Sequence, residues 1–355
     1  MTSLGGQAPI AATYPTAVGI SGNSQAVFGG ASQIFVYSNG TVSALGIDGT
    51  AYAINNSGQV VGNLGPSNVA SLYSNGTVQL LGLSAGAAAY GINDTGQITG
   101  ETSFTNNSNG YPSAFLYGNG PTTNIGNLCC NAPGSTGGSN GYAINASGQV
   151  TGVGIYSNWP TGTPAGSAFA FLYSNRAMTN LGTLGGMASF GQGISNNGLV
   201  TGSSLTAGNA AWHAYLYSRG AMRDLGTLAG DDASYGQGVN DSGDVVGVSV
   251  TGNSSVFRAF LYTNGQMLDL NTLVTSSPLA KDVTLFEAYA INNSGAIVAG
   301  GYNPTAGTDA YYLLTPTSAI ADNSPSSDGP IPIWALCALG ASLFGIASRR
   351  LKKAA

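Results

Sequence analysis

Carboxylates are the side chains of this chain best suited to chemistry, and they are few. The sequence has 14 acidic residues among 355, and six aspartates gather in one stretch of it: Asp224, Asp231, Asp232, Asp241, Asp244 and Asp269. Glycoside hydrolysis requires two carboxylates that face one another across the substrate. Asp224 and Asp269, however, occupy equivalent positions of two similar segments, where other segments carry Asn. We therefore interpret them as strand-end residues, and a polysaccharide-degrading enzyme is the weaker hypothesis.

Calcium is the one metal that the pattern suggests. Asn240, Asp241 and Asp244 form an oxygen-rich turn together with Ser242. A calcium loop normally gathers more carboxylates at fixed alternation, and a hydrogen-bonded hairpin turn explains the same residues without a metal. No phosphate-binding Gly loop, nucleophile motif or cofactor fingerprint is present. No cofactor is expected, apart from this candidate calcium site.

Aromatic residues in the longest insertions are candidate ligand-binding residues. They are Trp159, Tyr156, Tyr111 and Phe104, and they lie beside Asn and Ser. Aromatic faces next to such hydrogen-bonding groups suit sugar rings, and loops carry much of the binding in rigid scaffolds. The alternative is that these rings anchor their own loops.

A repeat organises the whole chain. An apolar residue, an Asn or Ser, a short polar turn with Gly and an apolar run ending in Gly recur seven times, with anchors at Ile20, Ile54, Ile92, Ile144, Ile194, Val239 and Ile291. A second block such as "AFLYSN" lies between the anchors. Each copy thus predicts four short strands, in the second copy 51–54, 59–62, 70–74 and 77–81, with Asn75 and Gly76 as a two-residue hairpin turn.

The spacing of the anchors predicts the architecture. Successive anchors are 34, 38, 52, 50, 45 and 52 residues apart, which matches propeller blades of roughly 40 to 50 residues better than the coils of a β-solenoid. We predict an all-β, seven-bladed β-propeller of four-stranded blades over residues 17–317. The seventh copy stops early, so residues 1–16, with the β-prone "PIAATYPT" from Pro9, are expected to supply the closing strand of the last blade.

The repeat resembles the HAF repeat, a family of probable extracellular repeats. The stretches "WHAYLYSRGAMRDLGTLAG" from Trp212 and "YGQGVNDSGDVVG" from Tyr235 carry the resemblance most fully, whereas the early copies lack the Asp-Leu-Gly-Thr-Leu element. The resemblance implies an extracellular location and a repeat architecture, without an assigned activity. His213, the only histidine, stands where the family often has His, so we interpret it as a structural blade residue and expect no catalytic residue.

The C-terminal segment predicts a membrane anchor. A polar linker, 318–330, precedes an uncharged apolar run, 331–348, and a basic end, 349–355. The run has 18 residues, near the lower limit for one transmembrane helix, and the basic end should remain cytoplasmic. A buried core helix is the alternative, which the lack of a polar face disfavours.

This arrangement resembles the PEP-CTERM, exosortase-type sorting signals of Gram-negative bacteria. The motif residues would be Pro330, Ile331 and Pro332 with Arg349 and Arg350, and the Glu of the usual Pro-Glu-Pro is absent. The resemblance implies a sorting enzyme of the exosortase type as a partner and attachment to, or release from, the cell surface. Because the first 16 residues have neither a basic start nor an apolar run, we expect a signal peptide upstream of Met1.

Composition narrows the partners. Only 9 residues are basic, four of them among the last seven, and the net charge is −5, which argues against nucleic acid. Cys129 and Cys130 are adjacent in a loop, as a vicinal disulfide or as two incidental thiols. We predict an exported, surface-associated interaction module in an extracellular polysaccharide or biofilm matrix, bound to a glycan or to another surface protein. The alternatives are a fibre-forming matrix protein and the enzyme named above.

Overall fold

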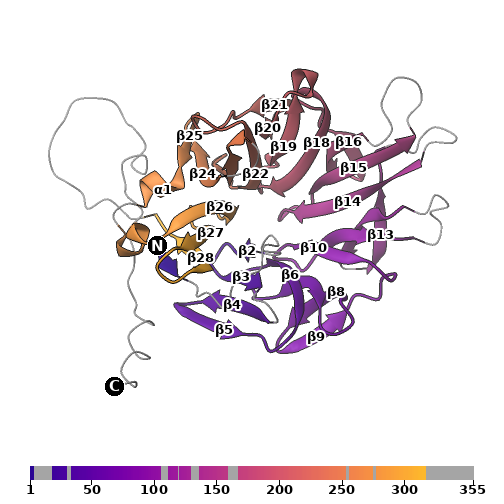
Figure 1. Ribbon diagram of the computed structural model, residues 1–355. Helices are drawn as coiled ribbons and strands as arrows, with labels where there is room; N and C mark the ends of the chain where they lie inside the picture. The colour runs from indigo at the N-terminus through magenta and orange to yellow at the C-terminus, as the bar shows by residue number, and fades with distance from the viewer. Residues whose placement is uncertain are drawn as a thin grey trace, which may run out of the picture.

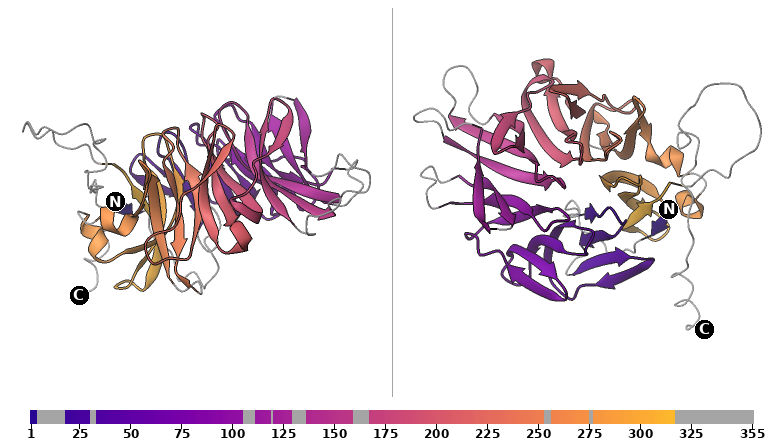
Figure 2. Two further views of the ribbon diagram at one scale, coloured as in Figure 1. Left: turned by 90° about the horizontal axis from the view of Figure 1, so that it is seen from above. Right: turned by 180° about the vertical axis from the view of Figure 1, so that it is seen from behind.

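The computed structural model describes residues 1–3, 18–29, 33–104, 111–118, 120–128, 136–158, 167–252, 256–274 and 277–316. They form seven antiparallel four-stranded sheets, arranged as blades around a common axis (Figures 1 and 2). The prediction of a seven-bladed β-propeller is confirmed. No helix among these residues is long and apolar enough to cross a membrane. The predicted linker, transmembrane helix and basic end lie outside the described residues, as do Cys129 and Cys130.

The blades follow the repeat in chain order. Blades 1 to 3 comprise β2 (Val18–Ile20), β3 (Ala26–Gly29), β4 (Ile34–Ser38) and β5 (Thr41–Ala44); β6 (Gly49–Ile54), β7 (Val60–Leu64), β8 (Val69–Ser74) and β9 (Thr77–Leu80); β10 (Ala88–Ile92), β11 (Ile98–Thr102), β12 (Ser113–Gly118) and β13 (Gly120–Gly126). Blades 4 and 5 comprise β14 (Thr136–Ile144), β15 (Val150–Asn158), β16 (Ala168–Ser174) and β17 (Ala177–Asn180); β18 (Gly185–Ile194), β19 (Val200–Thr206), β20 (Trp212–Ser218) and β21 (Ala221–Asp224).

The last two blades complete the ring. Blade 6 comprises β22 (Ala233–Val239), β23 (Val245–Val250), β24 (Phe257–Thr263) and β25 (Gln266–Asp269), and blade 7 comprises β26 (Thr284–Ile291), β27 (Ile297–Asn303), β28 (Thr308–Leu314) and β1 (Thr2–Ser3). Among the described residues, three short helices lie in the connections: η1 (Ala207–Asn209), α1 (Leu270–Leu273) and η3 (Pro278–Lys281). Asp269 accepts a hydrogen bond from the Asn271 N–H and so caps α1.

The ring is closed by the N-terminus. Thr2 pairs with Leu313 and Ser3 with Tyr312, so β1 becomes the fourth strand of blade 7 (Figure 1). β2 of blade 1 also packs against β26 and β27 of blade 7. The stretch from Pro9 that was expected to supply the closing strand lies outside the described residues. Because the ring is closed, each blade packs between two neighbouring blades. Such a ring leaves only short, protected sheet edges.

Alternation along the third strands forms the core. In β12, Phe115 is fully buried in a cluster shared by blades 2 and 3, whereas Ala114 belongs to the cluster shared by blades 3 and 4. Successive side chains of a strand point to opposite faces, so both faces of each sheet pack on neighbouring sheets, as the "AFLY" pattern predicts. The hairpins to the outer strands have the expected turns: Asn75 and Gly76 both have positive φ, 51° and 81°, as a type I′ turn requires.

A β-bulge interrupts the first strand of six blades. In blades 2 to 7 the pairing of first and second strands shifts two residues before the anchor, at Tyr52, Tyr90, Tyr142, Gln192, Gln237 and Tyr289, and blades 4, 5 and 7 have a second shift earlier in the strand. Bulges re-aim side chains and recur beside functional sites. Each bulged residue lies two positions before its anchor. In blades 2 to 7 the repeat therefore places one polar side chain, whose direction the bulge changes, on the innermost strand.

The conserved turn of the repeat also joins each blade to the next. Asn145 illustrates it: its Oδ1 accepts from the Ser147 and Gln149 N–H groups at 3.0 Å each, and its Nδ2 donates to Gln149 Oε1 at 2.7 Å. The same Nδ2 donates to the Ser195 carbonyl oxygen of blade 5 at 2.9 Å. Equivalent inter-blade bonds link Asn55 to Asn93, Asn93 to Asn145, and Asn292 to Ser21 across the closure.

Candidate ligand cavity of blades 5 to 7

A cavity of about 400 Å³ opens among the inner strands of blades 5 to 7, within the size range of ligand pockets. Its polar lining residues are Gln192, Ser203, Asp232, Tyr235, Gln237, Thr251 and Glu287, and its other lining residues are Ala233, Gly236, Val248, Val250, Gly252 and Phe257. Gln192 and Gln237 are bulged residues, and Tyr235 and Glu287 lie four positions before the anchors of blades 6 and 7. The repeat therefore positions the cavity.

Glu287 is the most perturbed carboxyl of the cavity. Burial raises its pKa to about 7, although hydrogen bonds with Tyr289 and Gln237 act in the opposite direction. Gln237 Nε2 donates to Glu287 Oε1 at 3.1 Å. Burial likewise raises the pKa of Tyr289, and the neighbouring Glu287 charge adds to the effect. A carboxyl that titrates near neutral pH in a cavity marks a candidate functional group.

An aromatic row leads to this cavity. The Phe190 and Trp212 rings of blade 5 lie 5.6 Å apart, and Trp212 is stacked at 6.5 Å and 28° on Tyr235, which lines the cavity. Phe190 and Tyr235 occupy the same repeat position in two adjacent blades, 5 and 6. Flat rings of this kind present their faces to apolar patches of a ligand, and the Tyr hydroxyl adds a polar end.

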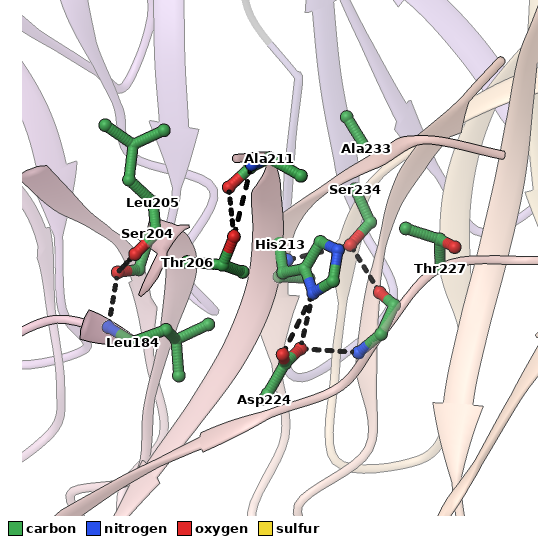
Figure 3. A network of polar contacts seen from close by, with 12 residues as sticks. Leu184, Ser204, Leu205, Thr206, Ala211, His213, Asp224, Thr227, Ala233 and Ser234 are labelled. Atoms are coloured by element: carbon green, nitrogen blue, oxygen red, sulfur yellow. Dashed lines mark hydrogen bonds and ion pairs between the residues drawn. The ribbon is translucent and has the colours of Figure 1, made fainter. Parts of the chain in front are cut away.

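The aspartates of the predicted acidic stretch have separate roles. Asp231 pairs with Arg258 at 2.8 Å, and Arg258 also approaches Asp269 at 3.5 Å; the hydrogen bond with Asp231 raises the pKa of Arg258. His213 Nδ1 contacts both carboxylate oxygens of Asp224 at 2.9 Å (Figure 3).

His213 and Arg258 are equivalent repeat residues, since they pair with Ser204 and Ser249 of the adjacent strands. Asp224 also accepts from the Gly226 N–H at 2.7 Å, which places it at a strand end, as interpreted from the sequence. Of the six aspartates, only Asp232 lines the cavity.

The candidate calcium residues take part in hydrogen bonds of the turn. Asn240 Nδ2 donates to Asp244 Oδ2 at 2.8 Å, and Thr263 Oγ1 donates to Asp244 Oδ1 at 2.9 Å. Asp241 accepts from the Asn196 N–H at 2.7 Å and from Asn293 Nδ2 at 2.6 Å, which links blades 5, 6 and 7. Among the described residues, no group of three or more His, Cys, Asp or Glu side chains could hold a metal ion.

The aromatic residues of the insertions have different environments. Tyr156 of β15 is 1% exposed and packs edge-on to Phe169 of β16 at 5.4 Å, so its ring belongs to the packing of these two strands. Phe104 packs, partly buried, against the cluster between blades 2 and 3. Tyr111 is 40% exposed, and Trp159 lies outside the described residues. Tyr156, Phe104 and Tyr111 do not line the cavity of blades 5 to 7, whose lining residues Thr251 and Gly252 follow the second strand of blade 6.

Glu287 was missed by the sequence analysis, although a signal exists. In the aligned repeats its position, four before the anchor, holds Thr50, Ala88, Asn140, Phe190 and Tyr235. A carboxylate there is the exception, on a strand that lies innermost in the ring. A second polar cluster was also missed: Tyr90 Oη donates to Glu101 Oε1 at 2.7 Å, and the Tyr90 ring contacts the bulged Tyr52 and Tyr142 at 5.0 and 5.5 Å.

The raised pKa of Glu287 predicts a pH dependence of stability. The folded-state pKa of about 7 exceeds the usual value of 4.5, so the folded protein binds the proton more tightly than the unfolded chain. The contribution is fully present below about pH 4.5 and is lost as the pH rises to about 7. Replacing Glu287 by Gln should raise the free energy of unfolding at pH 8 by on the order of 2 kcal/mol and should leave it nearly unchanged at pH 4.

Chemical denaturation at both pH values measures this difference. The matched control is Glu101→Gln, because Glu101 is the other glutamate of the chain, is also partly buried and also accepts a hydrogen bond, from Tyr90. An equal effect of Glu287→Gln at pH 4 and pH 8 would contradict the assignment.

Comparisons with known proteins show similarity in fold and assign no activity. No family model matches the chain, and no curated protein does. Among solved structures, a prolyl endopeptidase is 11% identical with a TM-score of 0.54, covering 84% of this chain and 46% of its own, so this chain spans less than half of it.

Two other similar structures are more distant. A gluconolactonase from Xanthomonas campestris is 12% identical with a TM-score of 0.40, covering 88% of this chain and 89% of its own. The β-propeller domain of the Trilobed protease from Pyrococcus furiosus is 7% identical with a TM-score of 0.47, covering 84% and 94%. At such identities the likeness concerns the fold alone, so the function has to be argued from this chain's own residues.

Proposed function

We propose that this protein is an exported, surface-associated binding module whose propeller holds a glycan in the cavity of blades 5 to 7. The observation that carries the proposal is the cavity itself, in which two amides, a tyrosine, two hydroxyls and two carboxylates converge on one space of about 400 Å³. Sugars present hydroxyl groups that need such paired donors and acceptors, since a buried polar group without a partner is costly.

The aromatic residues complete this complement. Tyr235 and Phe257 line the cavity, and the Trp212 ring extends the aromatic surface towards blade 5. The apolar C–H faces of a sugar ring pack on such rings while its hydroxyls reach the Gln and Glu groups. The cavity has the volume of roughly a dozen water molecules, which is enough for one or two sugar rings rather than for a folded partner.

The surface location rests on the sequence. The repeat resembles the extracellular HAF family, and residues 330–355 resemble an exosortase-type sorting signal with a membrane span. In this proposal the apolar run anchors the protein, or is removed during sorting, and the propeller lies outside the cell in the polysaccharide matrix. Deleting residues 330–355 should then release the protein from the membrane fraction of a Gram-negative host that has an exosortase; an unchanged distribution in cell fractionation contradicts the proposed anchor.

Binding is tested on the purified full chain with a panel of neutral, acidic and amino oligosaccharides. Tyr235→Ala should weaken binding of the retained glycan by about tenfold, the loss typical of a central aromatic contact. Tyr302→Ala is the matched control, because Tyr302 is 44% exposed and lies outside the lining. Equal effects of the two variants, or no retained glycan, would refute the cavity as the binding site.

A glycan hydrolase is the second candidate, because Asp232 and Glu287 line the same cavity and one of them has a pKa near 7. An acid with a raised pKa beside an ionised carboxylate is the arrangement that glycosidases use. Mass spectrometry of the bound oligosaccharide after prolonged incubation separates the candidates. Shortened oligosaccharides that appear with the wild type and not with Glu287→Gln would establish hydrolase activity. An oligosaccharide that stays intact supports the binding module instead.

A further inference from the structure

We propose that the cavity of blades 5 to 7 selects glycans that carry free amino groups, with Glu287 and Asp232 as the counter-ions of the ammonium group. This inference rests on the proposed glycan binding and assigns a ligand class to it. It is argued from the charge of the lining, from the surroundings of Glu287 and from the position of Asp232.

The lining is negative and has no compensating cation. Among its residues, all from the described part of the chain, two are carboxylates and none is Lys, Arg or His. The nearest cation along the chain, Arg258, is paired with Asp231 and Asp269. A uronate, sulfate or phosphate group would therefore meet unpaired negative charge, which is how a site rejects a ligand of its own sign. An ammonium group meets its complement.

Glu287 lacks a positive partner. The groups that face it are Gln237 of β22, which donates at 3.1 Å, Tyr289 of its own strand and Tyr311 of β28, with Asp309 acting on both tyrosines. Neutral donors and a further carboxylate leave the charged form of Glu287 poorly compensated, and burial raises its pKa to about 7. A ligand cation supplies the missing charge, and a charge pair in a partly dry cavity contributes more than one at the surface.

Asp232 adds the second negative group at the cavity. The residue is exposed, and its backbone N–H donates to the Val250 carbonyl oxygen at 2.9 Å, which holds it at the start of β22. Its Oδ2 lies against Gly252, where an added Cβ would come within 2.5 Å of it. An exposed carboxylate there attracts a cation before it reaches Glu287, an effect that salt screens.

Ion pairing at Glu287 has a defined proton balance. Near pH 6 the free carboxyl is mostly protonated, so binding of an ammonium group converts –COOH to –COO⁻ and releases about one proton to the solvent. Affinity should accordingly rise between about pH 5 and about pH 6.5. The opposite arrangement, in which protonated Glu287 donates a hydrogen bond to a neutral sugar, predicts affinity that falls as the pH rises and releases no proton.

The test uses isothermal titration of the full chain with three β-1,4-linked oligosaccharides of equal length, built from glucosamine, N-acetylglucosamine and glucose. The glucosamine chain should bind at least about tenfold more tightly than the other two, with proton release seen as a dependence of the heat on the buffer's ionisation enthalpy. Glu287→Gln should abolish both the preference and the proton release, so that the glucosamine and N-acetylglucosamine chains bind with similar affinity.

Asp232→Asn is the second variant, because an exposed residue can be changed without loss of the fold. It should reduce the preference for the amine by about threefold at low salt and less at high salt. Equal affinity for the amino and acetylated chains, or affinity that falls with rising pH, overturns the amine selectivity and leaves the proposed glycan binding standing. Absence of binding to all three chains, together with the wider panel, overturns both.

Discussion

Replacing Gly152 by Ala is expected to destabilise the propeller by more than about 3 kcal/mol, one of the largest effects that an added methyl group would have among the described residues. Gly152 lies in β15 opposite the bulge of β14, and an added Cβ would fall well inside the van der Waals distance of the Asn140 carbonyl oxygen and close to the Gly141 Cα. These are backbone atoms of the paired strand, so neither a rotamer change nor a side-chain shift relieves the overlap.

The same close approach recurs around the ring. Added Cβ atoms at Gly62, Gly100, Gly202 and Gly247 would also meet a backbone carbonyl oxygen of the first strand of their own blade. This Gly ends the apolar run in the repeats of blades 2 to 6, whereas the equivalent position holds Phe28 in blade 1 and Ala299 in blade 7. In blades 2 to 6 the bulge brings the first strand's carbonyl oxygen over the second strand, so that no room for a Cβ is left there.

Gly120→Ala is the matched control. Gly120 is also a strand glycine without a left-handed φ, and nothing lies within 4 Å of an added Cβ. It should change the free energy of unfolding by less than about 0.5 kcal/mol. Denaturant titration of both variants measures the contrast, and a Gly152→Ala protein as stable as Gly120→Ala would show that the bulged strands can separate.

Asn145→Ala is expected to cost about 2 to 4 kcal/mol, because buried groups on two blades lose their partners together. Asn145 is 3% exposed, and its side chain serves the Ser147 and Gln149 N–H groups, the Gln149 amide and the Ser195 carbonyl oxygen of the next blade. An alanine leaves these groups in a space too small for water to replace every bond.

Two further variants divide this loss between the turn and the blade-to-blade bond. Asn145→Asp keeps the acceptor for the turn and removes the donor to both Ser195 and Gln149, so its loss reports on these two bonds together with the burial of a carboxylate. Asn145→Ser imitates Ser195, whose Oγ accepts from the Leu199 N–H at 3.1 Å, and should retain part of the turn. Thermal and denaturant unfolding should show Asn145→Ala to be the least stable of the three variants. An Asn145→Asp protein as stable as wild type would contradict the role of Asn145 in joining the two blades.

Much of the architecture could be predicted because the repeat is local. Seven copies of the anchor turn and of a strand similar to "AFLY" encode the strands, hairpins and two-sided packing within about 40 residues each, and turns such as Asn75–Gly76 have one favoured geometry. The closing strand could not be predicted in detail, because any short extended segment can pair with an open edge. The structure shows β1 in that role at Thr2 and Ser3.

The candidate site was harder to predict, because its residues are isolated exceptions to the repeat. The aspartates were candidates because six of them lie in one stretch of the sequence. In the structure, however, Asp231 pairs with Arg258 and Asp224 with His213 within the blades. Glu287 stands alone among apolar residues of β26, and only the ring brings it beside Gln237 of the preceding blade. Tyr156, expected to face a ligand or to anchor its loop, is buried in β15 against Phe169 of β16.

The sequence by itself determined the blade, its fourfold strand pattern, its turns and the number of copies, since these follow from interactions between residues near one another in the chain. Only the tertiary structure decided which exceptional residues meet. Glu287 and Gln237 are 50 residues apart and touch because successive blades pack face to face, which brings their innermost strands side by side near the axis. There, burial from two blades raises the pKa of a carboxyl whose own strand gives no sign of it.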